Sequence, residues 1–305
     1  MDKPPVPTYC SCDMSEKRTR IADLRRMIPV SLGENDIQSL NLLGFQDGLF
    51  NVVGELVGLK ELEMDGSYVS SSDFEDCSGL PQLERLSARL CGDLDGDFLS
   101  HLDCHSSLRY LDLTQTPIGD RGVLALSQFT KLKSVQLMGI GATDVGMSGF
   151  ASLLDLENLD FSDNAITDNG MPSLASSVAL EYLKLNKTRI TDESFNIISS
   201  LRNLEEVDVT STDVTGVGFA GFCDKACLRS LSLRLCPVTE DGLRTVGGIL
   251  SLRHLDLSAT QLDVDWLRHL SQLNELETLE LRWIQVGDGE LRQLKRLPKL
   301  RHIST

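Results

Sequence analysis

Residues 180–195, LEYLKLNKTRITDESF, contain the pattern that predicts the fold. Leu180, Leu183 and Leu185 form an LxxLxL segment, and the alternation of apolar and polar residues at its end is typical of a β-strand. The following residues, up to Phe195, return to apolar side chains at helical spacing. We therefore expect a strand, a turn and a short helix within one unit.

The same unit recurs along most of the chain. Twelve LxxLxL-type segments begin at Ile37, Leu59, Leu83, Leu108, Leu132, Leu156, Leu180, Leu204, Leu228, Leu252, Leu276 and Leu300. From Leu108 onward the segments are 24 residues apart, and the earlier steps are 22, 24 and 25 residues. A period of this length indicates a solenoid, because one unit cannot bury its own apolar side and must stack on its neighbours. Positions are numbered below from the first residue of each segment.

An acidic residue recurs at position 13, just before the helical spacing begins. Its examples are Asp47, Asp95, Asp120, Asp144, Asp168, Asp192, Glu240 and Asp288. A carboxylate there accepts hydrogen bonds from the free amides of a first helical turn and lies at the positive end of the helix dipole. We therefore expect this residue to be the N-cap of the helix in its own repeat.

Three stretches carry a resemblance to a known family. SDNAITDNGM (162–171), NKTRITDESF (186–195) and RLCPVTEDGL (234–243) resemble helix-bearing leucine-rich repeats and are similar to the ITDxGL type of F-box-associated and bacterial proteins. The resemblance covers residues 37–305 and implies a recognition scaffold with diverse partners. Strands about 4.8 Å apart on one side and bulkier helices on the other would curve the stack. We expect an α/β fold, a right-handed solenoid or horseshoe with a concave parallel sheet and convex helices.

The two ends of the sequence differ from the repeats. We expect residues 1–14 to be a disordered leader and residues 15–36 to form an N-terminal helical cap. The helical pattern within the cap runs over Ser15–Ile28, and Pro29 ends it. A three-helix F-box needs several times that length, so we do not expect this segment to be one. Residues 37–305 then form one leucine-rich-repeat domain of eleven repeats and a terminal strand.

Composition narrows the classes of partner. The chain has 29 Lys and Arg against 45 Asp and Glu, a net charge of −16. This balance disfavours nucleic acid and anionic membrane, since binding to phosphates depends on basic side chains. A basic protein partner is compatible with it, and an acidic surface that serves solubility is the alternative. No apolar run reaches membrane-spanning length, and we expect a cytoplasmic protein.

Cysteine and histidine invite a metal or disulfide interpretation. Cys91 and Cys236 stand at position 9, where other repeats have Ser, Thr or Asn, and we expect these side chains to hydrogen-bond the backbone of the adjacent turn. We expect reduced thiols, no metal and no cofactor. His101, Cys104 and His105 supply three ligands where a closed zinc site needs four. Whether Cys10 and Cys12 bind a metal or pair with another chain is left open by the sequence.

The predicted binding site is the exposed face of the strands. Its candidate residues at positions 3, 5, 7 and 8 are Tyr110, Asp112, Asp160, Tyr182, Lys184, Asp208, Arg234, His254, Asp256, Arg282 and Trp283. The aspartates stand on alternate strands, about 10 Å apart, where a basic segment could follow them. Equally, a sheet tolerates like charges best when they alternate. Tyrosine and tryptophan are enriched at binding hot spots, although ordinary surface tyrosines are the alternative.

The functional prediction is a protein-interaction scaffold that binds its partner on the concave sheet. An inhibitor that occludes a partner enzyme, or a substrate-recognition subunit of a larger complex, are the alternatives. The sequence has no GxSxG, no GxxxxGK[ST] and no HExxH, so we do not expect an enzyme. Oligomeric state is not indicated by the sequence.

Overall fold

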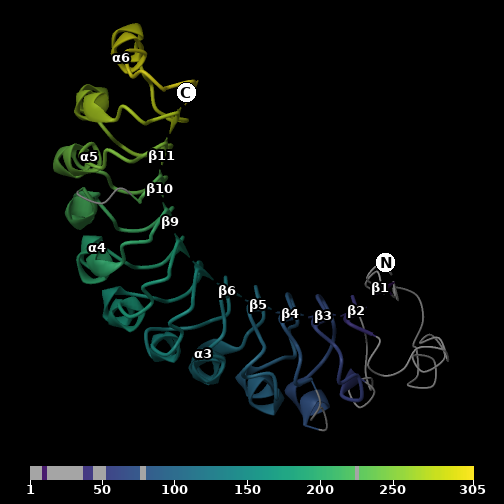
Figure 1. Ribbon diagram of the computed structural model, residues 1–305. Coiled ribbons are helices and arrows are strands. Elements are labelled where there is room, and N and C mark those ends of the chain that lie inside the picture. Colours follow the sequence, from purple (N-terminus) through teal and green to yellow (C-terminus); the bar gives the residue numbers. More distant parts are fainter. Residues whose placement is uncertain (1–8, 12–36, 44–52, 76–79, 224–226) are drawn as a thin grey trace, which may run out of the picture. The chain divides into compact units, whose positions relative to one another are not determined.

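The computed structural model describes residues 9–11, 37–43, 53–75, 80–223 and 227–305. The chain divides into two compact units, Met1–Leu156 (unit 1) and Glu157–Thr305 (unit 2), which are described separately. In each unit the strands line one side and the helical segments line the other (Figure 1). This two-sided arrangement follows from the strand, turn and helix that each repeat contains.

Each unit has a parallel sheet whose strands follow the order of the chain. Unit 1 contains β1 (Tyr9–Ser11), β2 (Ser39–Asn41), β3 (Glu61–Glu63), β4 (Arg85–Ser87), β5 (Tyr110–Asp112) and β6 (Ser134–Gln136). Unit 2 contains β7 (Asn158–Asp160), β8 (Tyr182–Lys184), β9 (Glu206–Asp208), β10 (Ser230–Ser232), β11 (His254–Asp256), β12 (Thr278–Glu280) and β13 (His302–Ser304). From β2 onward every strand occupies positions 3–5 of a predicted segment. The predicted leucine-rich-repeat fold class is confirmed.

The structure tests the predicted N-terminal leader at one short segment, Tyr9–Ser11. Tyr9–Ser11 was expected to lie in a leader without regular structure, but it forms β1 and pairs in parallel with β2. The edge of β2 offers backbone groups that an extended segment can satisfy, and this explains the extra strand. The rest of the predicted leader, and the predicted helical cap at 15–36, lie outside the described residues.

The helical segments are short, and many are 3₁₀ rather than α. Unit 1 has η1 (Ser71–Phe74), η2 (Gly96–His101), α3 (Gly119–Ala125), η3 (Leu126–Gln128) and η4 (Gly146–Phe150). Unit 2 has η5 (Asp168–Leu174), α4 (Asp192–Ile197), η6 (Ile198–Ser200), η7 (Val217–Phe222), α5 (Glu240–Val246), η8 (Val264–Gln272) and α6 (Asp288–Leu294). Pro172 lies inside η5, and Gly218 and Gly221 lie inside η7. These residues disfavour a continuous α-helix.

Stacked apolar side chains form the core between the strands and the helical segments. Leu180, Leu183 and Leu185 of one repeat are all completely buried. On the helical side, the rings of Phe195 and Phe219 stack with their centroids 4.3 Å apart. Neighbouring repeats therefore supply the apolar surroundings that a single repeat lacks.

Threonine, not the acidic residue of position 13, is the N-cap of η5, α4 and α5. Thr191 is the N-cap of α4, and its hydroxyl accepts from the Glu193 amide at 3.3 Å. Thr239 caps α5 in the same way, accepting from the Gly242 amide at 3.1 Å. The N-cap prediction is wrong for these repeats, because the helix begins one residue earlier than expected. Asp95, which caps η2, follows the prediction.

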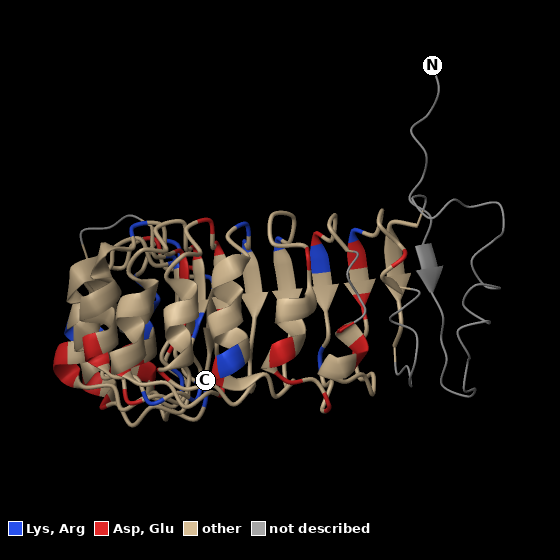
Figure 2. Ribbon diagram, turned by 90° about the horizontal axis from the view of Figure 1, so that it is seen from below, with Lys and Arg blue, Asp and Glu red and all other residues tan. Residues whose placement is uncertain are grey.

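The aspartate of position 13 instead binds the repeat that follows it. Asp168 accepts hydrogen bonds from the Thr191 amide at 2.9 Å, from the Thr191 hydroxyl at 2.7 Å and from the Ser194 hydroxyl. Asp192 accepts from the Thr215 amide at 3.0 Å and hydroxyl at 2.6 Å, and Asp120 of unit 1 has the same bonds to Thr143. Figure 2 shows the acidic first turns in red. Each such carboxylate joins its own first turn to the start of the next helical segment.

Position 9 forms the expected series of backbone contacts. The hydroxyl of Ser67 donates to the Leu42 carbonyl at 2.8 Å, and that of Thr116 donates to the Ala88 carbonyl at 2.6 Å. The Cys236 thiol reaches the Val209 carbonyl at 3.1 Å. In unit 2, Asn164, Thr188, Thr212 and Thr260 differ by donating within their own repeat, as Thr188 does to the Leu185 carbonyl at 2.6 Å. A small donor at this position thus satisfies a buried carbonyl.

Acid should weaken the contact between Asp168 and the next repeat. Burial alone would raise the pKa of Asp168, but hydrogen bonds from Ser194 and Thr191 outweigh it, so the pKa lies below its ordinary value. Such a group stabilises the fold above its unfolded pKa of about 4, and this stabilisation disappears as the pH falls through the folded pKa. We expect Asp168→Asn to lower the free energy of unfolding by about 1–2 kcal/mol at pH 7.

Urea denaturation at pH 7 and at pH 3 measures this difference. The gap between wild type and Asp168→Asn should narrow at the lower pH, because the carboxyl of the unfolded chain then binds protons before that of the folded chain, and Asp168 contributes less to the free energy of unfolding. Asp213→Asn is the control, since Asp213 is exposed in the same unit. An equal gap at both pH values would show that the charge of Asp168 has no role.

Two thiols should resist alkylation in the native protein. Burial raises the pKa of Cys91 and of Cys236 above the ordinary value, and the thiolate is the reactive form. Cys223 and Cys227 are only half-buried. Iodoacetamide followed by mass spectrometry should therefore modify Cys227 before Cys91 and Cys236, and all of them at similar rates in urea. Equal native rates would contradict the burial of these thiols.

Candidate functional site

The predicted site residues lie on the outer face of the strands. Position 4 of each strand from β2 to β12 is buried, so positions 3 and 5 on either side of it face away from the core, as Tyr182 and Lys184 do around Leu183. Tyr110 and Asp112 take these places in unit 1. Unit 2 brings together the other nine candidates, which are Asp160, Tyr182, Lys184, Asp208, Arg234, His254, Asp256, Arg282 and Trp283.

The aspartates of position 5 have a structural task that the sequence analysis missed. The register of unit 2 places Lys184 between Asp160 and Asp208, and Ser232 between Asp208 and Asp256. Each aspartate accepts from the backbone amide two residues later, at 3.0 Å for Asp160, 3.1 Å for Asp208 and 2.8 Å for Asp256. Asp112 of unit 1 does the same. These carboxylates terminate their strands as Asx-turns.

Asp208 is the most fully engaged of them. One of its oxygens accepts from the Thr210 amide and hydroxyl, and the other accepts from the Asn186 amide group at 3.0 Å. The hydroxyl of Ser162 in turn accepts from the backbone amide of Asn186 at 3.1 Å. The signal for this role is the Asp-x-Ser/Thr pattern of alternate strands, as in Asp208 and Thr210. A partner would compete with these bonds for the carboxylate.

Position 8 forms an exposed ridge beside the sheet, with an unusual backbone. Its non-glycine residues all have left-handed φ angles and are Leu90, Gln115, Asp163, Lys187, Ser211, Leu235, Ala259 and Trp283. In unit 2 the position 8 amide donates to the position 7 carbonyl of the next repeat, as from Leu235 to Ser258 at 3.0 Å. A bulky side chain in this conformation is uncommon, and Trp283 combines a φ of 67° with 84% exposure.

The strand face of unit 1 has a small cavity. Its volume is about 160 Å³, and it is lined by Gln38, Ser39, Lys60, Glu61, Glu84, Arg85 and Tyr110. The Arg85 guanidinium lies 4.1 Å from the centre of the Tyr110 ring, a cation–π contact. The register pairs Arg85 directly with Tyr110, which is how a sequence argument could have found this residue.

Comparisons with known proteins agree with this architecture. A family model described as Leucine Rich repeat matches residues 104–127 and 154–175. This chain contains leucine-rich repeats. The crystal structure of an internalin from Listeria monocytogenes is similar, with a TM-score of 0.60, 18% sequence identity and 93% of each chain covered. No curated protein matches the sequence.

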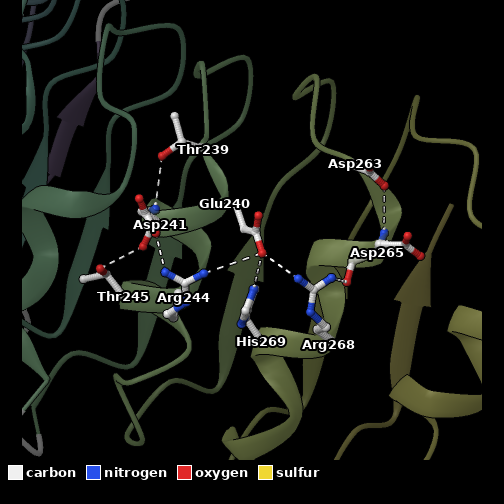
Figure 3. Close-up of polar contacts among 10 residues, drawn as sticks. Thr239, Glu240, Asp241, Arg244, Thr245, Asp263, Asp265, Arg268 and His269 are labelled. Carbon is white, nitrogen blue, oxygen red and sulfur yellow. Dashed lines mark hydrogen bonds and ion pairs between the residues drawn. The ribbon is translucent and has the colours of Figure 1, made fainter.

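On the helical side of unit 2, one leucine-rich repeat has glutamate at position 13. Glu240 stands there in place of aspartate, and the next repeat has Asp263 where others have threonine. A carboxylate at 263 has no proton to donate to a second one, and it caps η8 itself. The longer Glu240 side chain contacts two arginines and a histidine instead (Figure 3). Its Oε1 lies 2.5 Å from an Arg268 nitrogen, 3.0 Å from His269 Nε2 and 3.5 Å from an Arg244 nitrogen.

Neither a cluster of metal-ligating side chains nor a membrane-spanning helix occurs in the described part of the chain. It contains no group of three or more His, Cys, Asp or Glu side chains arranged to hold a metal ion. In the suspected cluster, the His105 ring packs edge-on against Phe129, with centroids 5.0 Å apart, and Cys104 is buried. Cys12 of the Cys10–Cys12 pair lies outside these residues. Every helix described here is too short or too polar to cross a bilayer.

Removing the charge of Glu240 should loosen the contact between its leucine-rich repeat and the next. We expect Glu240→Gln to lower the free energy of unfolding by about 1 kcal/mol at low salt, because Arg244, Arg268 and His269 lose their shared charged acceptor. The loss should shrink in 1 M NaCl, which screens exposed pairs. Urea denaturation at the two salt concentrations measures it.

Asp241→Asn is the matched control, because Asp241 is in the same first turn but pairs only with Arg244, at 75% side-chain exposure. This variant should lose less stability than Glu240→Gln. The opposite order would contradict the assignment of Glu240 as the shared acceptor.

Proposed function

We propose that this leucine-rich-repeat protein is an interaction scaffold that holds a protein partner on the strand face of unit 2. The observation that supports this most directly is the exposure of aromatic side chains there. Tyr182 is 37% exposed and Trp283 is 84% exposed, whereas position 4 of every strand between them is buried. Such side chains bury a large area on binding while losing little conformational entropy.

The first three strands of unit 2 suit a partner segment with basic residues. Tyr182 pairs in register with Glu206, and Glu181 and Glu205 precede these two residues. Asp160 and Asp208 add negative charge, although part of their hydrogen-bonding capacity is used within the fold. A lysine or arginine side chain of the partner would approach the carboxylates and pack its aliphatic part on the tyrosine ring.

A binding role accounts for the acidic residues better than a catalytic one. They recur with the repeats, where the aspartates of position 5 end their strands and those of position 13 bond to the following repeat. In the described part of the chain they are not gathered around a nucleophile. An inhibitor that occludes an enzyme, or a substrate-recognition subunit, would use the same face. These alternatives differ from a scaffold in the consequence of binding rather than in the surface.

Substitutions on this face should reduce partner binding and leave the fold intact. We expect Tyr182→Ala and Glu206→Lys each to weaken capture of the partner at least tenfold, a loss of about 1.4 kcal/mol or more. Tm should stay within about 2 °C of wild type, because neither side chain is buried. Quantitative mass spectrometry of native lysate captured on the immobilised full chain measures the effect.

Asp213→Lys provides the control for a charge change on an exposed residue off the strands. Asp208 is unsuitable for this test because its carboxylate holds the local turn. Proteins that bind wild type and both face variants equally would refute the proposal.

A further inference from the structure

We propose that the strand face of unit 2 is divided into two halves of opposite charge, and that its basic half, on β10–β13, binds an acidic segment of a protein partner. The inference rests on the proposed function of this face and extends it to a region where a basic segment would not fit. The acidic half is β7–β9, which includes Tyr182.

The acidic half has a large excess of negative charge. Positions 2, 3, 5, 7 and 8 of its three repeats include only two lysines, Lys184 and Lys187. The acidic residues at these positions are Glu157, Asp160, Asp163, Glu181, Glu205, Glu206 and Asp208.

The basic half reverses the balance. Its arginines at the same positions are Arg229, Arg234, Arg253, Arg282 and Arg301. Its acidic residues are Asp256, Glu277 and Glu280, while position 3 has His254 and His302. The sign of the charge therefore changes between β9 and β10, where Arg229 pairs with Glu205 at 3.2 Å.

The arginines of the basic half are accessible, whereas two of its three acids are engaged. Arg234, Arg253 and Arg301 are exposed, and none forms an ion pair with a residue that the structure describes. Glu280 lies 3.1 Å from the Arg282 guanidinium, and Asp256 accepts from the Ser258 amide. The cations that remain for a ligand thus outnumber the anions.

An apolar ridge lies directly beside these cations. Leu235, Ala259 and Trp283 occupy position 8 of three consecutive repeats, and Leu235 is 50% exposed. Arg234 and Arg282 each precede one of the large side chains and lie two repeats apart, about 10 Å along the sheet. A carboxylate of an extended segment can pair with the Arg234 guanidinium while an apolar side chain further along the segment packs against Trp283.

A protein segment fits this face better than a nucleic acid. A phosphate backbone carries negative charge along its whole length, and the acidic half of the same unit would repel it. A polypeptide can change its sign of charge along the sequence and match both halves. The partner inferred for the basic half is therefore an acidic peptide segment that contains apolar residues.

Two synthetic peptides of the same length and apolar residues test the division, one with glutamates and one with lysines at the same places. Each is fluorescein-labelled, and anisotropy is measured with the full chain at low salt. The glutamate peptide should bind saturably. Its affinity should fall at least tenfold in Arg234→Glu/Arg253→Glu and several-fold in Trp283→Ala, and stay unchanged in Glu206→Lys. The affinity of the lysine peptide should fall in Glu206→Lys and stay unchanged in Arg234→Glu/Arg253→Glu.

The matched control is Arg202→Glu, a charge reversal of an exposed arginine outside the strands. It should leave both affinities unchanged, and circular dichroism should confirm that all variants unfold at the wild-type temperature. If a single-stranded oligonucleotide displaces the glutamate peptide more effectively than an unlabelled copy of that peptide does, the protein-segment assignment is wrong.

The outcomes separate this inference from the proposed function. No binding of the glutamate peptide, or equal binding to wild type and to Arg234→Glu/Arg253→Glu, would overturn the basic half. The proposed function would survive that result if Tyr182→Ala and Glu206→Lys still reduce partner capture. Loss of both effects would remove the whole face as a binding surface.

Discussion

A leucine-rich repeat of 24 residues cannot enclose its own apolar side chains, and this constraint explains most of what is seen in both units. Each strand is only three residues long, and each helical segment spans one to three turns. Neither would be stable alone. Their stability comes from leucines and phenylalanines that are covered by the repeats before and after. The hydrogen bonds of Asp120, Asp168 and Asp192 follow the same logic, because they satisfy the first turn of a neighbouring repeat.

The same constraint decides how much the sequence could predict. Strand positions were predictable because leucines at positions 1, 4 and 6 recur with a fixed period, and β2–β13 fall where that period places them. The role of position 13 was not predictable from one repeat. Aspartate before a helix suggests a cap for that helix, but only the stack shows that Asp168 reaches Thr191 in the following repeat. The strand at Tyr9–Ser11 has no leucine pattern, so no periodic signal predicts it.

The candidate site was predictable in place but not in chemistry. In unit 2 the alternation of exposed and buried residues put Tyr182, Asp160, Asp208 and Asp256 on the strand face, where they lie, and Trp283 lies on the ridge beside it. The sequence pattern could not show that the aspartates form Asx-turns, because the amide that each one binds belongs to the backbone. The Arg85–Tyr110 contact was also missed, because it depends on pairing between strands. Which residues bind a partner stays a prediction.

The left-handed residue at position 8 has a consequence for how such a surface can change. The backbone there is held by an amide that donates to the next repeat, so the path of the chain does not depend on the side chain. Leucine, glutamine, aspartate, lysine, serine, alanine and tryptophan all occupy the position. A conformational penalty of about 1–2 kcal/mol is accepted at each one. The ridge can therefore diversify residue by residue during evolution, or under deliberate redesign, without any change to the interior that supports it.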